Sequence, residues 1–89
     1  MERRRILFSG RVQGVGFRAT ARATAAPFPI TGWVRNEPDG SVLLEVQGAA
    51  TEIDRFISAL NARMGRLITG QDSTSADPIP NEAGFEIRR

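Results

Sequence analysis

Hydrophobic and polar residues alternate along three segments of the chain, residues 5–12, 30–36 and 41–48. This period of two is typical of β-strands that bury one face. Between the first two segments, residues 17–26 read FRATARATAA, without glycine or proline and rich in alanine, the strongest helix former. We therefore predict a strand, a helix that ends at the PFP of residues 27–29, and two further strands.

The sequence NEPDGS between the second and third predicted strands indicates a tight turn. Pro38 fixes its own φ and Gly40 can adopt a left-handed conformation, a combination that favours a β-turn. The two strands are therefore expected to pair as an antiparallel hairpin.

A second helix is predicted over residues 51–64, where hydrophobic residues recur at the spacing of one helix face. These residues are Ile53, Phe56, Ile57, Leu60 and Met64. Thr51, with Asp54 three residues later, is expected to cap the start of this helix.

The last quarter of the chain carries weaker signals. Residues 66–72 are predicted to form a poor strand, and residues 73–84 a loop, because the latter contain two prolines and no periodicity. The final GFEIRR, residues 84–89, is expected to be a short strand that buries Phe85 and Ile87.

The predicted order β-α-β-β-α-β, followed by the short terminal strand, indicates a ferredoxin-like α+β fold. In this fold a mostly antiparallel sheet carries both helices on one face. Residues 1–89 have the length of a single domain and show no linker or internal repeat. The first two strands should run parallel with the third between them. The loop from Gln13 to Arg18 and the strand end at Asn36 would then share one edge of the sheet, roughly 10 Å apart.

The composition excludes several kinds of chemistry. The chain has no cysteine or histidine, and all 12 of its basic residues are arginine. Any reaction must therefore use carboxylates, hydroxyls, amides, guanidinium groups or the backbone. The isoelectric point of about 11.0 does not indicate nucleic-acid binding, because the net charge is only +2 and arginine keeps its proton to very high pH.

No apolar run in the sequence is long enough to cross a bilayer, and the first ten residues lack the apolar stretch of a signal peptide. We therefore expect a cytoplasmic protein that does not interact with membranes.

The segment VQGVGFRA, residues 12–19, is the strongest candidate for function. Its Gly14, Gly16 and Ala19 match the dinucleotide fingerprint G-x-G-x-x-G/A. That interpretation fails because a dinucleotide-binding fold needs successive parallel strands, whereas the hairpin predicted after Asn36 returns the chain antiparallel.

The same glycines let successive backbone N–H groups converge at the start of a helix, which is an anion-binding arrangement. Arg18 adds a planar guanidinium that can bind a phosphate through two donors. A cation in the first turn opposes the helix dipole, and a bound anion would relieve that conflict. The alternative is that Gly14 and Gly16 only shape a tight turn and that Arg18 is a solvated surface residue.

Two segments, FSGRVQGVGFR (8–18) and GWVRNEPDGSVLLEVQG (32–48), closely resemble the signature segments of acylphosphatases, and the terminal GFEIR is similar to that family's ending. The resemblance implies hydrolysis of the carboxyl–phosphate bond of acyl phosphates, to carboxylate and inorganic phosphate, on a ferredoxin-like fold. It also implies that Arg18 binds the phosphoryl group and that Asn36 orients the attacking water. Backbone amides would hold the phosphoryl oxygens, which gives a substrate-binding set of Gln13, Gly14, Val15, Gly16, Phe17 and Arg18.

This reaction suits a chain without histidine. The leaving carboxylate has a conjugate acid with a pKa of about 4, so it departs without a general acid. Phosphoryl transfer has a loose transition state, so the water needs little deprotonation before it attacks. Arg18 and the amides can stabilise the phosphoryl charge, and we therefore expect neither a metal nor a cofactor.

Several residues keep alternative interpretations. Asn36 precedes a turn and could bond its own backbone. Trp33 lies on the face opposite Val34, where we expect partial exposure, with packing or base stacking as its role. Residues 3–5, three arginines, are expected to be a solvated strand start.

Two other classes of protein remain alternatives. An RNA-binding ferredoxin-like module would need aromatic residues on its two central strands, and the third predicted strand has none. A non-catalytic module could bind a small anion without reacting with it. Our main expectation is a monomer whose partners are a small-molecule acyl phosphate and inorganic phosphate, with no nucleic acid.

Overall fold

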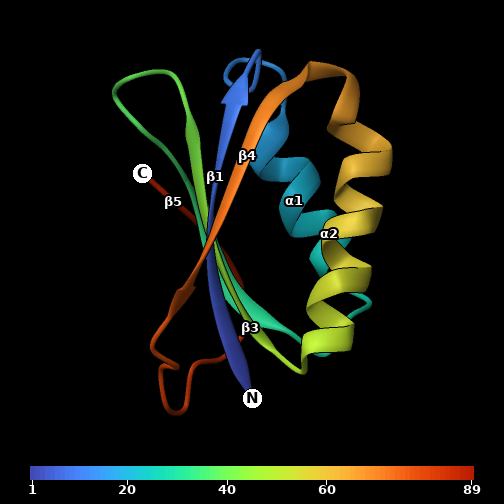
Figure 1. Cartoon of the computed structure of the whole chain (residues 1–89), viewed down its shortest axis with the longest axis vertical. Helices are drawn as coiled ribbons and strands as arrows, with labels where there is room; N and C mark the ends of the chain where they lie inside the picture. Colours follow the sequence, from blue (N-terminus) through green and yellow to red (C-terminus); the bar gives the residue numbers. More distant parts are fainter.

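The computed structural model describes residues 1–89, and its elements follow the predicted order (Figure 1). The strands and helices are β1 (Glu2–Gly10), α1 (Phe17–Ala25), β2 (Thr31–Asn36), β3 (Val42–Gly48), α2 (Ala50–Met64), β4 (Ile68–Ala76) and β5 (Phe85–Arg88). A short 3₁₀ turn, Gly65–Leu67, links α2 to β4. The predicted ferredoxin-like α+β fold is confirmed.

The five strands form one sheet in the order β4-β1-β3-β2-β5. Strand β3 is antiparallel to both β1 and β2, so β1 and β2 run parallel on either side of it, as predicted. Phe8 of β1 and Asn36 of β2 both pair with Val42 of β3. The carboxyl ends of β1 and β2 therefore lie at the same edge of the sheet, two strand spacings apart.

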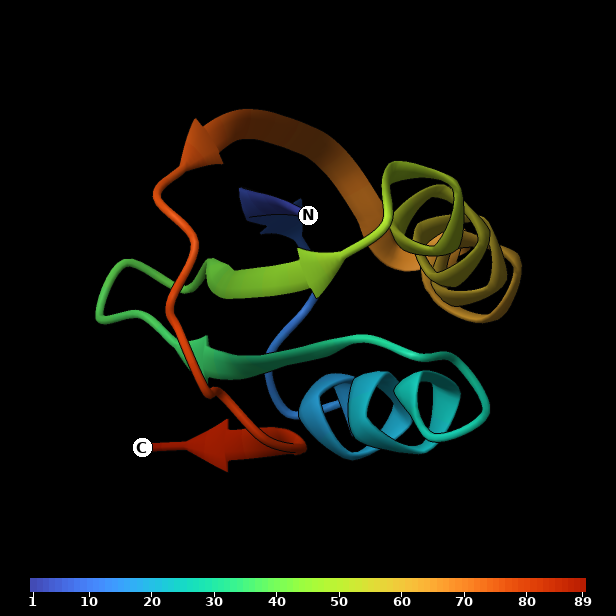
Figure 2. The same cartoon turned by 90° about the horizontal axis from the view of Figure 1, so that it is seen from below.

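Both helices pack on one face of the sheet (Figures 1 and 2). Side chains from this face and from the helices form the core, which includes Ile6, Phe8, Phe17, Ala21, Ala25, Val34, Val42, Leu44, Val46, Ile53, Phe56 and Leu60. Aromatic rings join the layers, with 5.0 Å between the ring centroids of Phe8 and Phe17 and 5.6 Å between those of Phe56 and Phe85. Neither helix is long and apolar enough to span a membrane.

The segment 77–84 crosses the other face of the sheet, because β4 and β5 are its opposite edges (Figure 2). Gln47 of β3 fastens this crossing segment: its side-chain NH₂ donates to the Ile79 carbonyl at 2.9 Å, and its side-chain oxygen accepts from the Ile79 N–H at 2.7 Å. At this end of the sheet, the face without helices is therefore covered by the crossing segment and is not exposed to solvent as a flat surface.

Arg3 is buried beneath the crossing segment, with a side chain that is 0% exposed. Its Nε donates to Glu45 Oε1 at 2.6 Å, and its Nη1 donates to Glu82 Oε1 at 2.8 Å. Glu82 also accepts a hydrogen bond from the Thr31 hydroxyl at 2.7 Å. The prediction that residues 3–5 are all solvated is thus wrong for Arg3, because residues distant in sequence cover it. Arg5 remains half-exposed.

Trp33 is also less exposed than predicted, at 4%. The guanidinium groups of Arg35 and Arg88 lie over its ring, 5.0 and 4.9 Å from the centroid. These cation–π contacts cover the ring face that a nucleic-acid base would need for stacking. Packing is therefore the role that the structure gives to Trp33.

Several predictions about the ends of elements need correction. Strand β1 begins at Glu2, so it extends further toward the N-terminus than the predicted residues 5–12 and ends earlier. Residues 73–76, predicted as loop, belong to β4 because they pair with β1. Helix α2 has no side-chain cap: its N-cap is Ala49, and Asp54 instead accepts a hydrogen bond from Arg4 at 2.7 Å.

The Arg3 cluster generates a prediction about stability. Arg3→Met removes the buried charge and leaves Glu45 and Glu82 without their shared partner, so we expect a loss of about 3–5 kcal/mol in the free energy of unfolding. The control is Arg5→Met, which breaks a bond to the same Glu45 but from a half-exposed side chain, and should cost about 1 kcal/mol or less. Urea denaturation at neutral pH measures both. Equal losses in the two variants would contradict the burial argument.

The same cluster predicts how stability depends on pH. Burial raises the pKa of Glu45 and Glu82, but hydrogen bonds from Arg3, with Arg5 or Thr31, outweigh it and hold each pKa below the usual 4.5. Each carboxyl therefore adds stability above pH 4.5 and loses it as the pH falls through its folded-state pKa.

We expect the free energy of unfolding to decline as the pH is lowered below 4.5. Glu82→Gln removes one titrating group, so this variant should be less stable at pH 6 but show a shallower decline toward pH 3. Denaturation curves across this range decide the matter. An identical decline in both proteins would show that Glu82 does not contribute.

Candidate active site

The loop between β1 and α1 takes the conformation that its glycines allow. Gly14 and Gly16 have φ values of 74° and 77°, in the left-handed region that L-residues other than glycine rarely adopt. Gly16 is the residue that precedes the first turn of α1. A Cβ at either position would meet nothing within 4 Å, so the backbone conformation, and not lack of space, requires glycine here.

The backbone N–H groups from Gln13 through Ala19 donate no hydrogen bond within the protein. The first turn of a helix always leaves such donors free, and the loop adds further ones directly before it. The positive end of the helix dipole lies at the same place. This stretch of backbone therefore offers several donors to an anion.

A pocket of about 220 Å³ lies against these donors. It is lined by Val12, Gly14, Gly16, Phe17, Arg18, Ala19, Asn36, Ile87 and Arg89. Two guanidinium groups and no carboxylate are among the lining side chains, so the pocket favours a negatively charged ligand. No three carboxylates anywhere in the chain come together in a way that could hold a metal ion.

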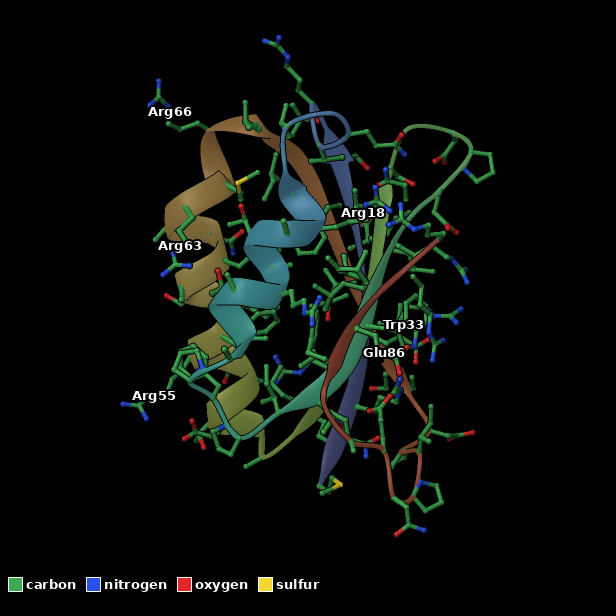
Figure 3. All side chains as sticks on the ribbon, turned by 180° about the vertical axis from the view of Figure 1, so that it is seen from behind. Arg18, Trp33, Arg55, Arg63, Arg66 and Glu86 are labelled. Carbon is green, nitrogen blue, oxygen red and sulfur yellow. The ribbon has the colours of Figure 1, made fainter.

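Arg18 lies in the first turn of α1, between that helix and the strands of the sheet (Figure 3). Its Nη1 donates to the main-chain carbonyl of Arg88 at 3.4 Å, a long hydrogen bond, and it forms no ion pair with a carboxylate. Most of the guanidinium's five donors are therefore available to a ligand in the pocket.

Asn36 is the last residue of β2, and its side chain makes no hydrogen bond within the protein. The turn that follows is closed by Asp39, whose Oδ1 accepts from the Ser41 N–H at 2.9 Å and from the Ser41 hydroxyl at 2.5 Å. These bonds hold the pKa of Asp39 below its usual value. Asp39 thus performs the turn function considered for Asn36, and leaves the Asn36 amide free to face the pocket.

The remaining residues of the predicted binding set divide into two groups. Gly14, Gly16 and Phe17 line the pocket with Arg18, whereas Gln13 and Val15 do not. The Gln13 side chain turns to the β2–β3 hairpin, where its NH₂ donates to the carbonyls of Glu37 and Ser41 at 2.7 and 2.9 Å. Gln13 therefore ties the loop to the hairpin that follows Asn36.

Ile87 and Arg89 line the pocket but were not identified from the sequence. They reach it because β5 pairs with β2 in parallel, at the edge of the sheet beside α1. The alternation of GFEIRR identified Ile87 as a buried residue, but that local pattern says nothing about which strand β5 joins.

Residues 4–87 match the sequence model of the acylphosphatase family. The acylphosphatase of Salinibacter ruber is 43% identical over 83 residues, which cover 91% of this chain and 86% of that protein. The acylphosphatase of Methanospirillum hungatei is 37% identical over 90 residues, which cover 100% of this chain and 99% of that protein.

Solved structures show the same fold. The crystal structure of acylphosphatase from Bacillus subtilis aligns with a TM-score of 0.88 at 29% identity and covers 100% of both chains. The crystal structure of HypF from T. kodakarensis aligns with a TM-score of 0.86 at 26% identity, covering all of this chain and 12% of that one.

The fold and the pocket together define a small ferredoxin-like protein with an arginine-lined pocket where its first loop meets the end of its second strand. The sequence matches identify the family, and the chain belongs to the acylphosphatases.

Proposed function

We propose that this protein hydrolyses acyl phosphates in the pocket that contains Arg18 and Asn36. Water forms a bond to phosphorus while the bond from phosphorus to the acyl oxygen breaks, and the carboxylate leaves with that electron pair. Both protons of the water remain on the phosphate, so an acyl phosphate dianion and water give a carboxylate and dihydrogen phosphate. The observation that carries this proposal is one pocket that is lined by no Asp or Glu side chain and that holds an arginine without an ion pair, an amide without a hydrogen bond and free backbone donors.

Arg18 and the backbone amides bind the phosphoryl group. The planar guanidinium can donate two parallel hydrogen bonds to phosphoryl oxygens, and the loop N–H groups can donate to the others. Charge on these oxygens persists through the loose transition state, so donors that are already in place stabilise it without rearrangement. The glycines at 14 and 16 set this arrangement before substrate binds.

Asn36 positions the attacking water. An amide cannot take a proton, but its oxygen can accept a hydrogen bond from water and hold it in line with the breaking bond. The loose transition state requires little deprotonation of that water in advance. Gln13 supports this geometry indirectly, because it holds the loop and the hairpin after Asn36 together.

The reaction, as proposed, needs no metal or other cofactor. A carboxylate with a conjugate-acid pKa of about 4 leaves unaided, and arginine with backbone amides supplies the charge stabilisation that Mg²⁺ gives in other phosphoryl transfers. The partners are a small-molecule acyl phosphate and inorganic phosphate, and we propose that a monomer suffices. A module that only binds an anion would use the same pocket, and measured turnover distinguishes the two.

Substitutions of Arg18 and of Asn36 should impair binding and turnover to different extents. Arg18→Ala should weaken phosphate binding and abolish most turnover, and Arg18→Lys should also be poor because a point charge cannot replace a planar pair of donors. Asn36→Ala should lower kcat on the order of 100-fold with nearly unchanged phosphate affinity, because it contacts water and not the phosphoryl group.

The measurements are kcat, phosphate Kd and melting temperature on each variant. Asn61→Ala on α2 is the matched control for Asn36→Ala, since it makes the same change away from the pocket. If Asn36→Ala lowered the melting temperature but kept a normal kcat, the assignment of Asn36 to the reaction would be wrong.

Phosphate and chelators provide an independent prediction. Inorganic phosphate should inhibit competitively and should stabilise the native state by about 2.7 kcal/mol at a hundredfold excess over its Kd. Hydrolysis of acetyl phosphate should be unaffected by EDTA. Activity that vanished with EDTA and returned with Mg²⁺ would contradict the mechanism, and an unchanged melting temperature in saturating phosphate would contradict the site.

A further inference from the structure

The pocket that holds Arg18 and Asn36 continues into a second hollow along the outer edge of β5. This hollow has a volume of about 380 Å³ and is lined by Arg22, Phe85, Glu86, Ile87 and Arg89. Ile87 and Arg89 line both hollows, so the two adjoin. A ligand whose phosphoryl group occupies the first hollow can therefore extend its other end into the second.

Helix α1 contributes one arginine to the lining of each hollow: Arg18 to the first and Arg22 to the second. Arg18 and Arg22 are four residues apart, and side chains at this spacing stand one above the other, with Cβ atoms about 5–6 Å apart. Arg22 is therefore one helical turn further from the phosphate site, in the direction in which the second hollow extends. Like charges at this spacing repel, and anions bound along this face would remove the repulsion.

The arginines at these hollows lack carboxylate partners within the chain. Six of the twelve arginines form ion pairs: Arg3, Arg4, Arg5, Arg35, Arg55 and Arg88. Arg18, Arg22 and Arg89 are among the six that do not, and all three line the two hollows. Half of the arginines without a carboxylate partner therefore lie where the substrate would lie.

Glu86 is the only acidic residue at the second hollow, and its carboxylate faces the other side of the sheet. It pairs in register with Trp33. Figure 3 shows Glu86 beside Trp33, on the side of the strands away from the helices. Its Oε2 lies 3.6 Å from Arg88 Nε. Glu86 therefore does not neutralise Arg22.

The floor between the charged groups is apolar. Phe85 and Ile87 alternate with Glu86 along β5 and are partly buried against the core beneath the helices. A short hydrocarbon chain can pack on these two side chains while its ends meet guanidinium groups. This is the shape and charge pattern of a molecule with an anion at each end and methylene groups between.

From these observations, and resting on the proposed function, we propose that the second hollow is the acyl subsite, in which Arg22 binds an anionic group at the far end of the acyl chain and Arg89 lies where the two hollows meet. The preferred substrate class is then the monoacyl phosphates of short dicarboxylic acids. Their hydrolysis products would be a dicarboxylate and inorganic phosphate.

The test compares glutaryl phosphate with pentanoyl phosphate, two five-carbon acyl phosphates that differ in a terminal carboxylate. Rates are corrected for uncatalysed hydrolysis, and the readout is the ratio of the two kcat/KM values. The wild-type ratio should favour glutaryl phosphate by about five- to tenfold, the size of a partly exposed charge-assisted hydrogen bond. Arg22→Gln, which keeps a long polar side chain and good helix propensity, should bring the ratio close to one.

Arg66→Gln is the matched control, because Arg66 is exposed, forms no ion pair, lies beyond the end of α2 and lines neither hollow. It changes the net charge equally and should keep the wild-type ratio. Arg22→Glu should reverse the preference in favour of pentanoyl phosphate.

A wild-type ratio near one would overturn the acyl subsite while leaving the proposed function intact. So would an Arg22→Gln variant that lost activity on both substrates equally, since that is the signature of a structural role. Failure to hydrolyse either substrate would instead overturn the proposed function itself.

Discussion

The pairing of β3 between β1 and β2 is the constraint on which the rest of the molecule depends. Val42 pairs in register with Phe8 on one side and with Asn36 on the other, so the two flanking strands must end at the same edge of the sheet. The loop after β1 then begins α1 at that edge, and Asn36 faces it across two strand spacings. Without this pairing, the glycine-containing loop would still have free N–H groups, but the Asn36 side chain would not lie opposite them. The side chain of Gln13 fixes the remaining freedom, because it joins the loop to the hairpin through two backbone carbonyls.

The crossing segment 77–84 connects β4 to β5, which lie at opposite edges of the sheet. It must pass over the face that carries no helix, and there it closes over Arg3, Glu45 and Glu82. Buried ion pairs are costly to desolvate, and they favour the folded state only when their hydrogen bonds are complete. In this cluster they are complete, since no buried side-chain nitrogen or oxygen lacks a partner. The crossing delivers β5 to β2, and β5 brings Ile87 and Arg89 to the pocket.

Sequence periodicity predicted the helices, the central hairpin and the loop glycines because those features depend on neighbours within a few residues. It placed Arg18 and Asn36 at one edge because topology follows from element order. It failed for Arg3 and Trp33, which it expected to be solvated or partly exposed, because their cover comes from Glu82 and Arg88, far along the chain. Residues 73–76 were misassigned for the same reason: SerThrSerAla has no strand periodicity of its own, and only pairing with β1 makes it a strand. Which residues complete the site at β5 likewise depends on a long-range strand pairing that local pattern does not encode.

Arginines perform two separate tasks in this chain, and the task depends on whether a carboxylate lies within hydrogen-bonding distance of the guanidinium. On the face without helices, Arg3 and Arg5 share Glu45, so their charge is used to hold strands and the crossing segment together. Along α1, Arg18 and Arg22 repel each other and face no carboxylate, and a like-charge pair at this spacing costs about a few tenths of a kcal/mol. The two positions therefore favour anion binding for two reasons. A bound anion removes the repulsion between the guanidinium groups, and their N–H donors do not first have to break an ion pair within the protein. Arginine suits both tasks for the same physical reason: its planar, permanently charged fork makes directional bonds to carboxylate and phosphate alike.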